Sequence, residues 1–419
     1  MKKTFKRVLT VFLAVMLVAG LGILPAYADE AVTLKWAVWD TNLTTYYQPL
    51  IDAYTAANPN VTIEMVDLGS SDYQNALITQ LTGNADLDVV CVKDIPGYAN
   101  LVKGGYLIPL NDVGVDTSVY GGTIEQITVD GSYYALPFRS DHWVIFYNKD
   151  AFDAAGVAYP TNDMTMAEYD ALARAVTSGV GAEKVYGAHY HTWRSAVSLF
   201  SILDGKHTVV DGNYDFMKDT YELILAEQND GICQDYGTLK ATSTHYSGVF
   251  FNNQAAMLNM GTWFIPTQID KIKSGESLST NWGIVKYPHP EGVPAGTTLG
   301  TITSVAVNAA SKKQDAAIDF VKFVAGPEGA SILAETGTFP AIKTAEVLDI
   351  LAAQDGFPAD ENSKEALATV QVYLEMPMHD KAADIERVLN EAHDGIMTYA
   401  FTVDEGIAMM NEEVSAILG

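Results

Sequence analysis

The sequence predicts an α/β protein made of two doubly wound lobes, and three observations support this class. Strand-like and helix-like segments alternate along almost the whole chain, as in sheets covered by helices. The length of 419 residues exceeds what one ordinary hydrophobic core organises, so we expect two domains. Hydrophobic residues make up 48% of the chain, which excludes general disorder.

Residues 1–28 are predicted to be a secretory signal peptide. A basic segment ends at Arg7, residues 8–23 form an apolar run, and a small-residue cleavage site ends at Ala28. No later stretch is apolar enough to span a bilayer. We therefore expect an exported, extracytoplasmic protein, either periplasmic or secreted. Because no cysteine lies near the cleavage site, we expect no lipid anchor.

The chain is strongly acidic. Its net charge is −27, and removal of the four positive charges in residues 1–28 leaves −31 for the mature protein. Such a surface repels nucleic acid and anionic lipid, so neither is an expected partner. A disulfide between Cys91 and Cys233 is chemically allowed in an oxidising compartment, although the domain assignment below places them in different lobes.

The pattern in the first third of the chain predicts three strands that alternate with three helices. The strands are expected over 33–39, 61–65 and 87–92, and the last is a continuous apolar run typical of a central parallel strand. The helices show apolar spacing from Tyr47 to Tyr54, a start at Asp72, and an end at Gly104-Gly105.

The stretch 133–157 organises the rest of the chain. It follows Asp130-Gly131, a tight-turn dipeptide, and contains an apolar strand over 143–147. A short helix comes next, with Asp150 as its predicted cap and Gly156 as its end. Between turn and strand, aromatic residues lie beside a guanidinium, a carboxylate and an imidazole, a mixture that more often marks a ligand site than a plain loop.

The remaining elements follow the same alternation. A capping box at Thr165 and Glu168 opens a helix to about Val176. Further strands are expected over 186–189, 255–260, 282–286 and 301–307, with helices over 194–203 and 214–228. From residue 311 the chain is predicted to be mostly helical, with Pro327 at a helix start and a break over 336–340.

The candidate site residues lie mainly where strands end, since ligands of open α/β sheets bind beyond the carboxyl ends of strands. Aromatic faces stack on the C–H face of a sugar, while carboxylates and hydroxyls hydrogen-bond its hydroxyl groups, so this mixture suits a neutral polyol. The candidates are Trp39, Asp40, Ser71, Asp72, Asp94, Arg139, Asp141, His142, His191, Trp193, Trp263, Thr301 and Phe339.

Four segments resemble the family 1 extracellular solute-binding proteins, the maltose-binding-protein-like components of ABC sugar importers. They occur in the family's order along essentially the whole mature chain. The matching segments are Ala135-Leu136-Pro137 with 146–156, residues 250–263, residues 319–329, and residues 337–341.

The resemblance implies two α/β lobes joined by a multi-crossing hinge, the type II periplasmic-binding-protein arrangement, with a sugar held between them. It implies a di- or oligosaccharide as ligand, membrane permease subunits as partners, a monomer, no cofactor and no catalysis. It assigns 29–138 and 290–337 to lobe one, 143–285 and 342–419 to lobe two, and hinge crossings near 139–142, 286–289 and 338–341.

The resemblance also suggests roles for individual residues. Asp141 falls on the hinge-side acidic ligand residue, Trp263 on a stacking tryptophan, and Asp94 near the acidic residue after the third strand. Trp39 and Asp40 fall on the first-strand loop. The pair of His191 and Trp193 lies where the second lobe's first ligand loop is expected.

Two other classes of function stay open at this stage. A glycoside-acting enzyme needs two carboxylates roughly 5–10 Å apart, which Asp40, Asp94 and Asp141 offer, although no common nucleophile or metalloprotease motif occurs. A metal receptor would use His189 and His191, which share a strand face but are few for a metal site. A polyamine receptor would use the same aromatics and acids.

Overall fold

The computed structural model describes residues 31–42, 44–69, 72–120 and 123–419, so the predicted signal peptide and Ser71 lie outside the described residues. The described strands form a nine-stranded sheet in the order β2-β1-β3-β8-β4-β6-β5, with β7 pairing β4 and β9 pairing β8. The strands are β1 (Val32–Val38), β2 (Val61–Asp67), β3 (Val89–Val92), β4 (Leu136–Asn148), β5 (Tyr186–His189), β6 (Ala255–Gly261), β7 (Trp282–Lys286), β8 (Thr297–Val307) and β9 (Gln371–Leu374).

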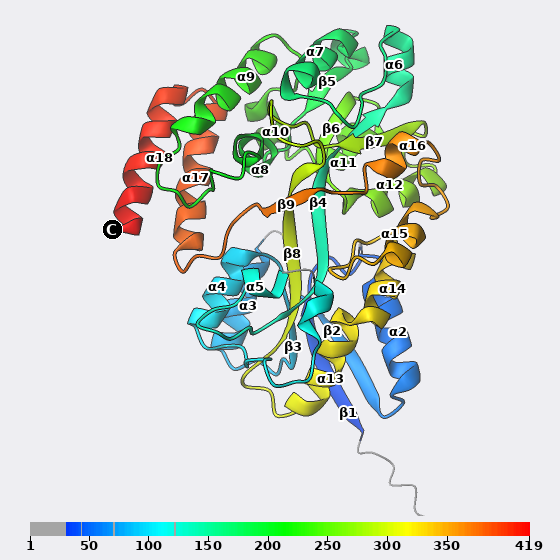
Figure 1. The fold of residues 1–419 in the computed structure, drawn as a ribbon, viewed down its shortest axis with the longest axis vertical. Helices are drawn as coiled ribbons and strands as arrows, with labels where there is room; N and C mark the ends of the chain where they lie inside the picture. The colour runs from blue at the N-terminus through cyan, green and yellow to red at the C-terminus, as the bar shows by residue number, and fades with distance from the viewer. Residues whose placement is uncertain (1–30, 43, 70–71, 121–122) are drawn as a thin grey trace, which may run out of the picture.

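Helices cover the sheet in two groups, and Figure 1 shows the molecule as two halves connected by the long strands β4 and β8. The lower half, with β1–β3, contains α2 (Tyr47–Ala57), α3 (Tyr73–Thr82), α4 (Ile95–Lys103), α5 (Thr123–Gln126), α13 (Gln314–Ala325) and α14 (Pro327–Glu335). The upper half, with β5–β7, contains α6 (Lys149–Ala155), α7 (Met166–Val176), α8 (Ser195–Ser198), α9 (Lys218–Asn229), α10 (Tyr236–Thr242), α11 (Tyr246–Phe251), α12 (Phe264–Lys273), α16 (Glu361–Glu365), α17 (Ala382–Met397) and α18 (Val403–Leu418), while α15 (Ala345–Ala352) lies between the halves. The predicted two-lobed α/β class is confirmed.

Strand β4 changes partners half-way along its length. Its first part, as far as His142, pairs with β8, and its second part, from Trp143 onward, pairs with β6 and β7. The segment at Pro340 pairs with Arg139 beside it. Backbone pairing therefore joins the two halves through residues 139–142 and at Pro340.

After β7 the chain stays with the upper half as far as His289. The backbone of His289 still pairs with Thr165, at the start of α7 in the upper half. Strand β8 then carries the chain down, beginning at Thr297 rather than at the predicted Thr301. The first residues of β8 are Thr-Thr-Leu-Gly, which lack the apolar alternation by which a strand is recognised. The boundaries of the two lobes remain a prediction.

Local signals predicted most element ends. The capping box of Thr165 and Glu168 is present, and Gly156 ends α6 in the left-handed conformation at φ 67°. The cap of α6 is Asn148 rather than Asp150, because the Asn148 side chain accepts from two N–H groups of the first turn. Strand β9 was not predicted. No described helix has both the length and the apolar character needed to cross a membrane.

The two cysteines are buried and carry free thiols. Cys91 lies in β3 of the lower half, whereas Cys233 follows α9 in the upper half. The structure therefore contains no bond between them.

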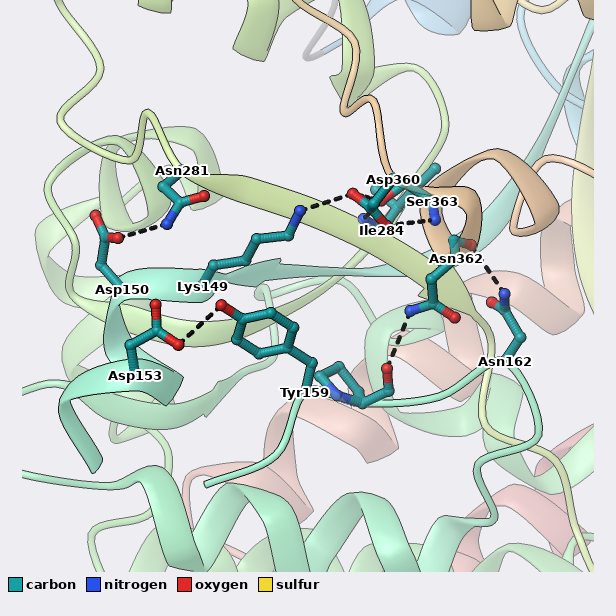
Figure 2. Close-up of polar contacts among 11 residues, drawn as sticks. Lys149, Asp150, Asp153, Tyr159, Asn162, Asn281, Ile284, Asp360, Asn362 and Ser363 are labelled. Atoms are coloured by element: carbon teal, nitrogen blue, oxygen red, sulfur yellow. Dashed lines mark hydrogen bonds and ion pairs between the residues drawn. The ribbon is translucent and has the colours of Figure 1, made fainter. Parts of the chain in front are cut away.

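Side chains cover the free edge of β7, as Figure 2 shows. The N–H of Ile284 donates to Ser363 Oγ at 3.1 Å, and the N–H of Lys286 donates to Asn162 Oδ1 at 2.9 Å. An ion pair of 2.6 Å between Lys149 and Asp360 anchors the segment that supplies Ser363. An uncovered strand edge invites pairing with another chain, so this cover protects the sheet.

Replacing Ser363 with alanine is expected to lower the free energy of unfolding by about 1–3 kcal/mol, because the buried N–H of Ile284 loses its acceptor. The control is Tyr159→Phe, which removes an exposed hydrogen bond to Asp153 and is expected to change stability by less than about 0.5 kcal/mol. Urea unfolding measures both variants, and equal midpoints for the two would contradict the proposed protection.

Candidate ligand-binding site

Alternate side chains of β4 form the floor between the two halves. Arg139, Asp141 and Trp143 share one face of the strand. Arg139 Nε lies 3.1 Å from Asp141 Oδ2, and Thr262 Oγ1 donates to Asp141 Oδ1 at 2.8 Å. Asp141 is 1% exposed, and burial raises the pKa of its carboxyl while Arg139 acts in the opposite direction. Because protein groups contact both oxygens, Asp141 ties β4 to the loop after β6 in this structure.

An aromatic cluster lies above this floor in the upper half. The Trp143 and Trp263 ring centroids are 5.4 Å apart, and those of Trp263 and Trp193 are 6.3 Å apart. His191 meets Trp193 edge-on at 4.5 Å, and Tyr246 lies 5.6 Å from Trp193. Trp193 is 41% exposed, so part of its indole is open to a ligand. The structure therefore brings the predicted residues His191, Trp193 and Trp263 together.

Burial favours the neutral form of the histidines in this cluster. Burial lowers the pKa of His191 to about 3, helped by the nearby His189 and His245. His189 Nδ1 lies 2.9 Å from Gln234 Oε1, so this ring nitrogen already has a hydrogen-bond partner within the protein. Among the described residues, no group of three or more His, Cys, Asp or Glu side chains is arranged to hold a metal ion.

The loop after β1 supplies the opposing wall from the lower half. Trp39 is buried against Tyr73, with ring centroids 4.9 Å apart, and Lys93 Nζ lies 5.7 Å from the Trp39 ring centroid. Burial lowers the pKa of Lys93, while the charge of Asp40 acts against this lowering. Burial lowers the pKa of His245 in the upper half, while the charge of Asp40 acts against this lowering.

A cavity of about 600 Å³ opens between α4 of the lower half and α17 of the upper half. Two predicted residues, Asp94 and Thr301, line it. Asp94 caps α4, and its Oδ1 accepts from the Gly97 N–H at 2.8 Å and from Gln74 at 3.1 Å. Burial raises the pKa of Asp94. The volume lies within the range of ordinary small-molecule pockets.

Four charged residues of the cavity were missed by sequence reasoning, namely Arg194, Glu375, Glu386 and Arg387. Glu375 accepts a hydrogen bond from Trp143 Nε1, and burial raises its pKa to about 7. Arg194 forms an ion pair of 2.7 Å with Glu386. A signal existed for one of them, since Arg194 directly follows the predicted Trp193.

Three predicted residues lie outside the floor, the wall after β1, the aromatic cluster and the cavity. His142 and Phe339 are each 1% exposed and meet edge-on at 5.3 Å, on the β4 face opposite Asp141. Asp72 precedes α3 and accepts a hydrogen bond from Asn75 at 2.7 Å. Their positions are those of core packing and of a helix start.

Known proteins provide an independent comparison. The family model of the bacterial extracellular solute-binding proteins matches residues 40–331. A lactose-binding protein of Rhizobium radiobacter is 26% identical over 315 residues, which are 71% of this chain and 70% of that protein.

Solved structures resemble the chain over nearly its full length. The crystal structure of a sugar transporter from Rhizobium etli, in an open conformation, is 57% identical, with a TM-score of 0.81. The match covers 92% of this chain and 100% of that one. An ABC substrate-binding protein from Listeria monocytogenes, solved in complex with cycloalternan, shares the fold at 19% identity, with a TM-score of 0.80 over 93% and 100% of the chains. This chain belongs to the bacterial extracellular solute-binding proteins.

Proposed function

We propose that the protein captures an uncharged sugar, a di- or oligosaccharide, between its two halves and delivers it to the permease of an ABC importer. One observation carries the proposal. The partly exposed Trp193 is connected through Trp263 and Trp143 to Glu375, which lines the cavity of about 600 Å³. A stacking face and hydrogen-bonding groups therefore lie in one connected arrangement, which is what a sugar requires.

The relatives support the same class of ligand. The Rhizobium radiobacter relative is a lactose-binding protein, a relative in Pseudomonas aeruginosa is a mannitol-binding protein, and the 57% identical structure is that of a sugar transporter. We infer that ligand contacts from both halves stabilise a closed arrangement, and that affinity reflects contacts which exist only when the halves meet.

The proposal includes export by residues 1–28, a monomeric state, no lipid anchor and release of the sugar unaltered. The carboxylates support binding without catalysis. Glycoside hydrolysis needs one carboxylic acid and one carboxylate on either side of the scissile bond. Asp141 is engaged by Arg139 and Thr262, and Asp94 is engaged as a helix cap, so neither is a free nucleophile.

A thermal-shift panel on the mature chain tests the proposal. Lactose, maltose, mannobiose, mannitol and the common monosaccharides are each added, with putrescine and spermidine as cationic alternatives. At least one sugar is expected to raise the melting temperature, because a ligand that binds only the folded state stabilises it by about 2.7 kcal/mol at one hundred times its Kd. A shift with polyamines and with no sugar would replace the proposed ligand class.

A further inference from the structure

Four carboxylates belong to the floor or to the cavity between the two halves, and protein groups engage them to different degrees. Asp141 is paired with Arg139 and Thr262, and Glu386 is paired with Arg194. The cap carboxylate Asp94 receives two N–H donors on one oxygen. Three of the four therefore already have strong partners within the protein.

Glu375 differs from the other three. Among the described residues, the indole N–H of Trp143 is the one group that donates a hydrogen bond to its side chain. Glu375 also lines the cavity, directly after β9, while its backbone N–H donates to Gly300 and so fixes its position beside β8. The protein backbone thus holds the Glu375 carboxyl group in place, and this group can still accept further hydrogen bonds from a ligand.

We propose that Glu375 is the acidic residue that accepts ligand hydroxyls in this cavity and that excludes anionic sugars from it. This inference rests on the proposed function and names the charge class of the ligand. A carboxylate accepts up to about four hydrogen bonds, and hydrogen bonds to a charged acceptor are roughly twice as strong as neutral ones.

The charged groups around Glu375 are consistent with the exclusion of anionic sugars. Burial is the main cause that raises the pKa of Glu375 to about 7, and the carboxylates of Glu386 and Asp94 act in the same direction, while Trp143 and Arg194 lower it. Arg194 is already engaged by Glu386, and Arg387 also lines the cavity. An anionic ligand would face three carboxylates and two guanidinium groups here, and one of these guanidinium groups is paired with Glu386, whereas a hydroxyl or ammonium group supplies the donor that Glu375 lacks.

The sign of the pH effect follows from this arrangement. A ligand hydroxyl that donates to Glu375 stabilises its ionised form, so binding lowers the pKa of Glu375. Affinity for a neutral sugar is therefore expected to rise as the pH increases through about 7 and to fall in acid. The indole donor of Trp143 also stabilises the ionised form, so its removal is expected to move the midpoint upward.

Calorimetric titrations from pH 5.5 to 8.5 test the proposal on the mature chain. The probes are lactose, maltose, mannobiose and mannitol, with lactobionate as the anionic counterpart of lactose and putrescine as a cation. The wild type is expected to bind at least one neutral sugar more tightly at pH 8.5 than at pH 5.5, and lactobionate at least tenfold more weakly than lactose if lactose binds. The Glu375→Gln variant is expected to lose about tenfold in sugar affinity at pH 8 and to lose the pH dependence.

Three variants separate this role from a structural one. Glu375→Asp keeps the charge and is expected to keep the pH dependence, and Trp143→Phe is expected to shift its midpoint upward. Glu361→Gln removes the same charge from an 84% exposed carboxylate at the start of α16 and is expected to behave as the wild type. If Glu375→Gln fails to fold, the shifted midpoint of Trp143→Phe decides the question.

Failure of the inference differs from failure of the proposed function. Sugar binding by Glu375→Gln with unchanged affinity and an unchanged pH profile would overturn the inference and leave sugar capture standing. Binding of lactobionate as tightly as lactose would do the same. If putrescine is the one probe that binds, and Glu375→Gln abolishes this binding, the charge-selecting role of Glu375 stands and the proposed sugar ligand is rejected. If no probe binds the wild type, both are rejected.

Discussion

The Arg139→Met variant is expected to lose about 3–5 kcal/mol of unfolding free energy, the largest single-residue effect that we foresee. The Arg139 side chain is 17% exposed and that of its partner Asp141 is 1% exposed. Removal of the guanidinium leaves the Asp141 charge buried, with Thr262 as a neutral donor. Arg139 also donates to Tyr46 and Thr303 of the lower half, so the packing of β4 against β8 weakens as well.

Urea unfolding measures this loss against two matched variants. The double variant Arg139→Met, Asp141→Leu removes both charges and is expected to recover most of the stability, because replacing a whole buried pair with apolar residues is often neutral. Arg174→Met breaks two more exposed ion pairs, with Asp170 on α7 and with Asp230, and is expected to cost less than about 1 kcal/mol. Equal losses for Arg139→Met and Arg174→Met would show that the buried Asp141 carboxylate does not depend on Arg139 for its stabilisation.

The Trp193→Ala variant is expected to weaken sugar binding by about 1–3 kcal/mol, which corresponds to roughly 5-fold to 150-fold in Kd. Trp193 is 41% exposed and lies at the open end of the aromatic cluster, so it offers a ring face without holding the core together. We therefore expect the loss in affinity with a change in unfolding free energy of less than about 1 kcal/mol.

Two measurements separate these effects. Titration calorimetry gives Kd for the sugar that raises the melting temperature most, and urea unfolding gives the stability of the same variant. Trp193→Phe keeps a stacking ring and is expected to retain most of the affinity. Unchanged Kd in Trp193→Ala would place the sugar away from the aromatic cluster.

Local chemistry in the sequence predicted most of the fold. The Asp130-Gly131 turn is present, with both residues at positive φ, because these residue types accept the left-handed region that a tight hairpin requires. Strands β5 and β7 match the predicted bounds, since apolar runs end abruptly there. Strand β9 was missed because four residues of mixed polarity carry no period, and its pairing with β8 is set by tertiary contact.

The site was predicted less completely, for a physical reason. Trp39, Asp94, Trp193 and Trp263 follow strand ends, so a rule based on neighbouring residues finds them. Glu375 lies 232 positions from Trp143, and no local pattern predicts that these side chains meet. Asp141 was predicted as a ligand contact, but its burial depends on Arg139 and on the distant Thr262. Charge pairing across the fold decides which carboxylate stays available.

The crystal structure of the mature protein with its tightest-binding sugar tests this account most directly. We predict a sugar between the two halves, with one ring over the indole of Trp193 and a hydroxyl within about 3.2 Å of a Glu375 oxygen. The sugar is predicted to be chemically intact. A sugar bound outside the cavity, touching neither Trp193 nor Glu375, would contradict the account.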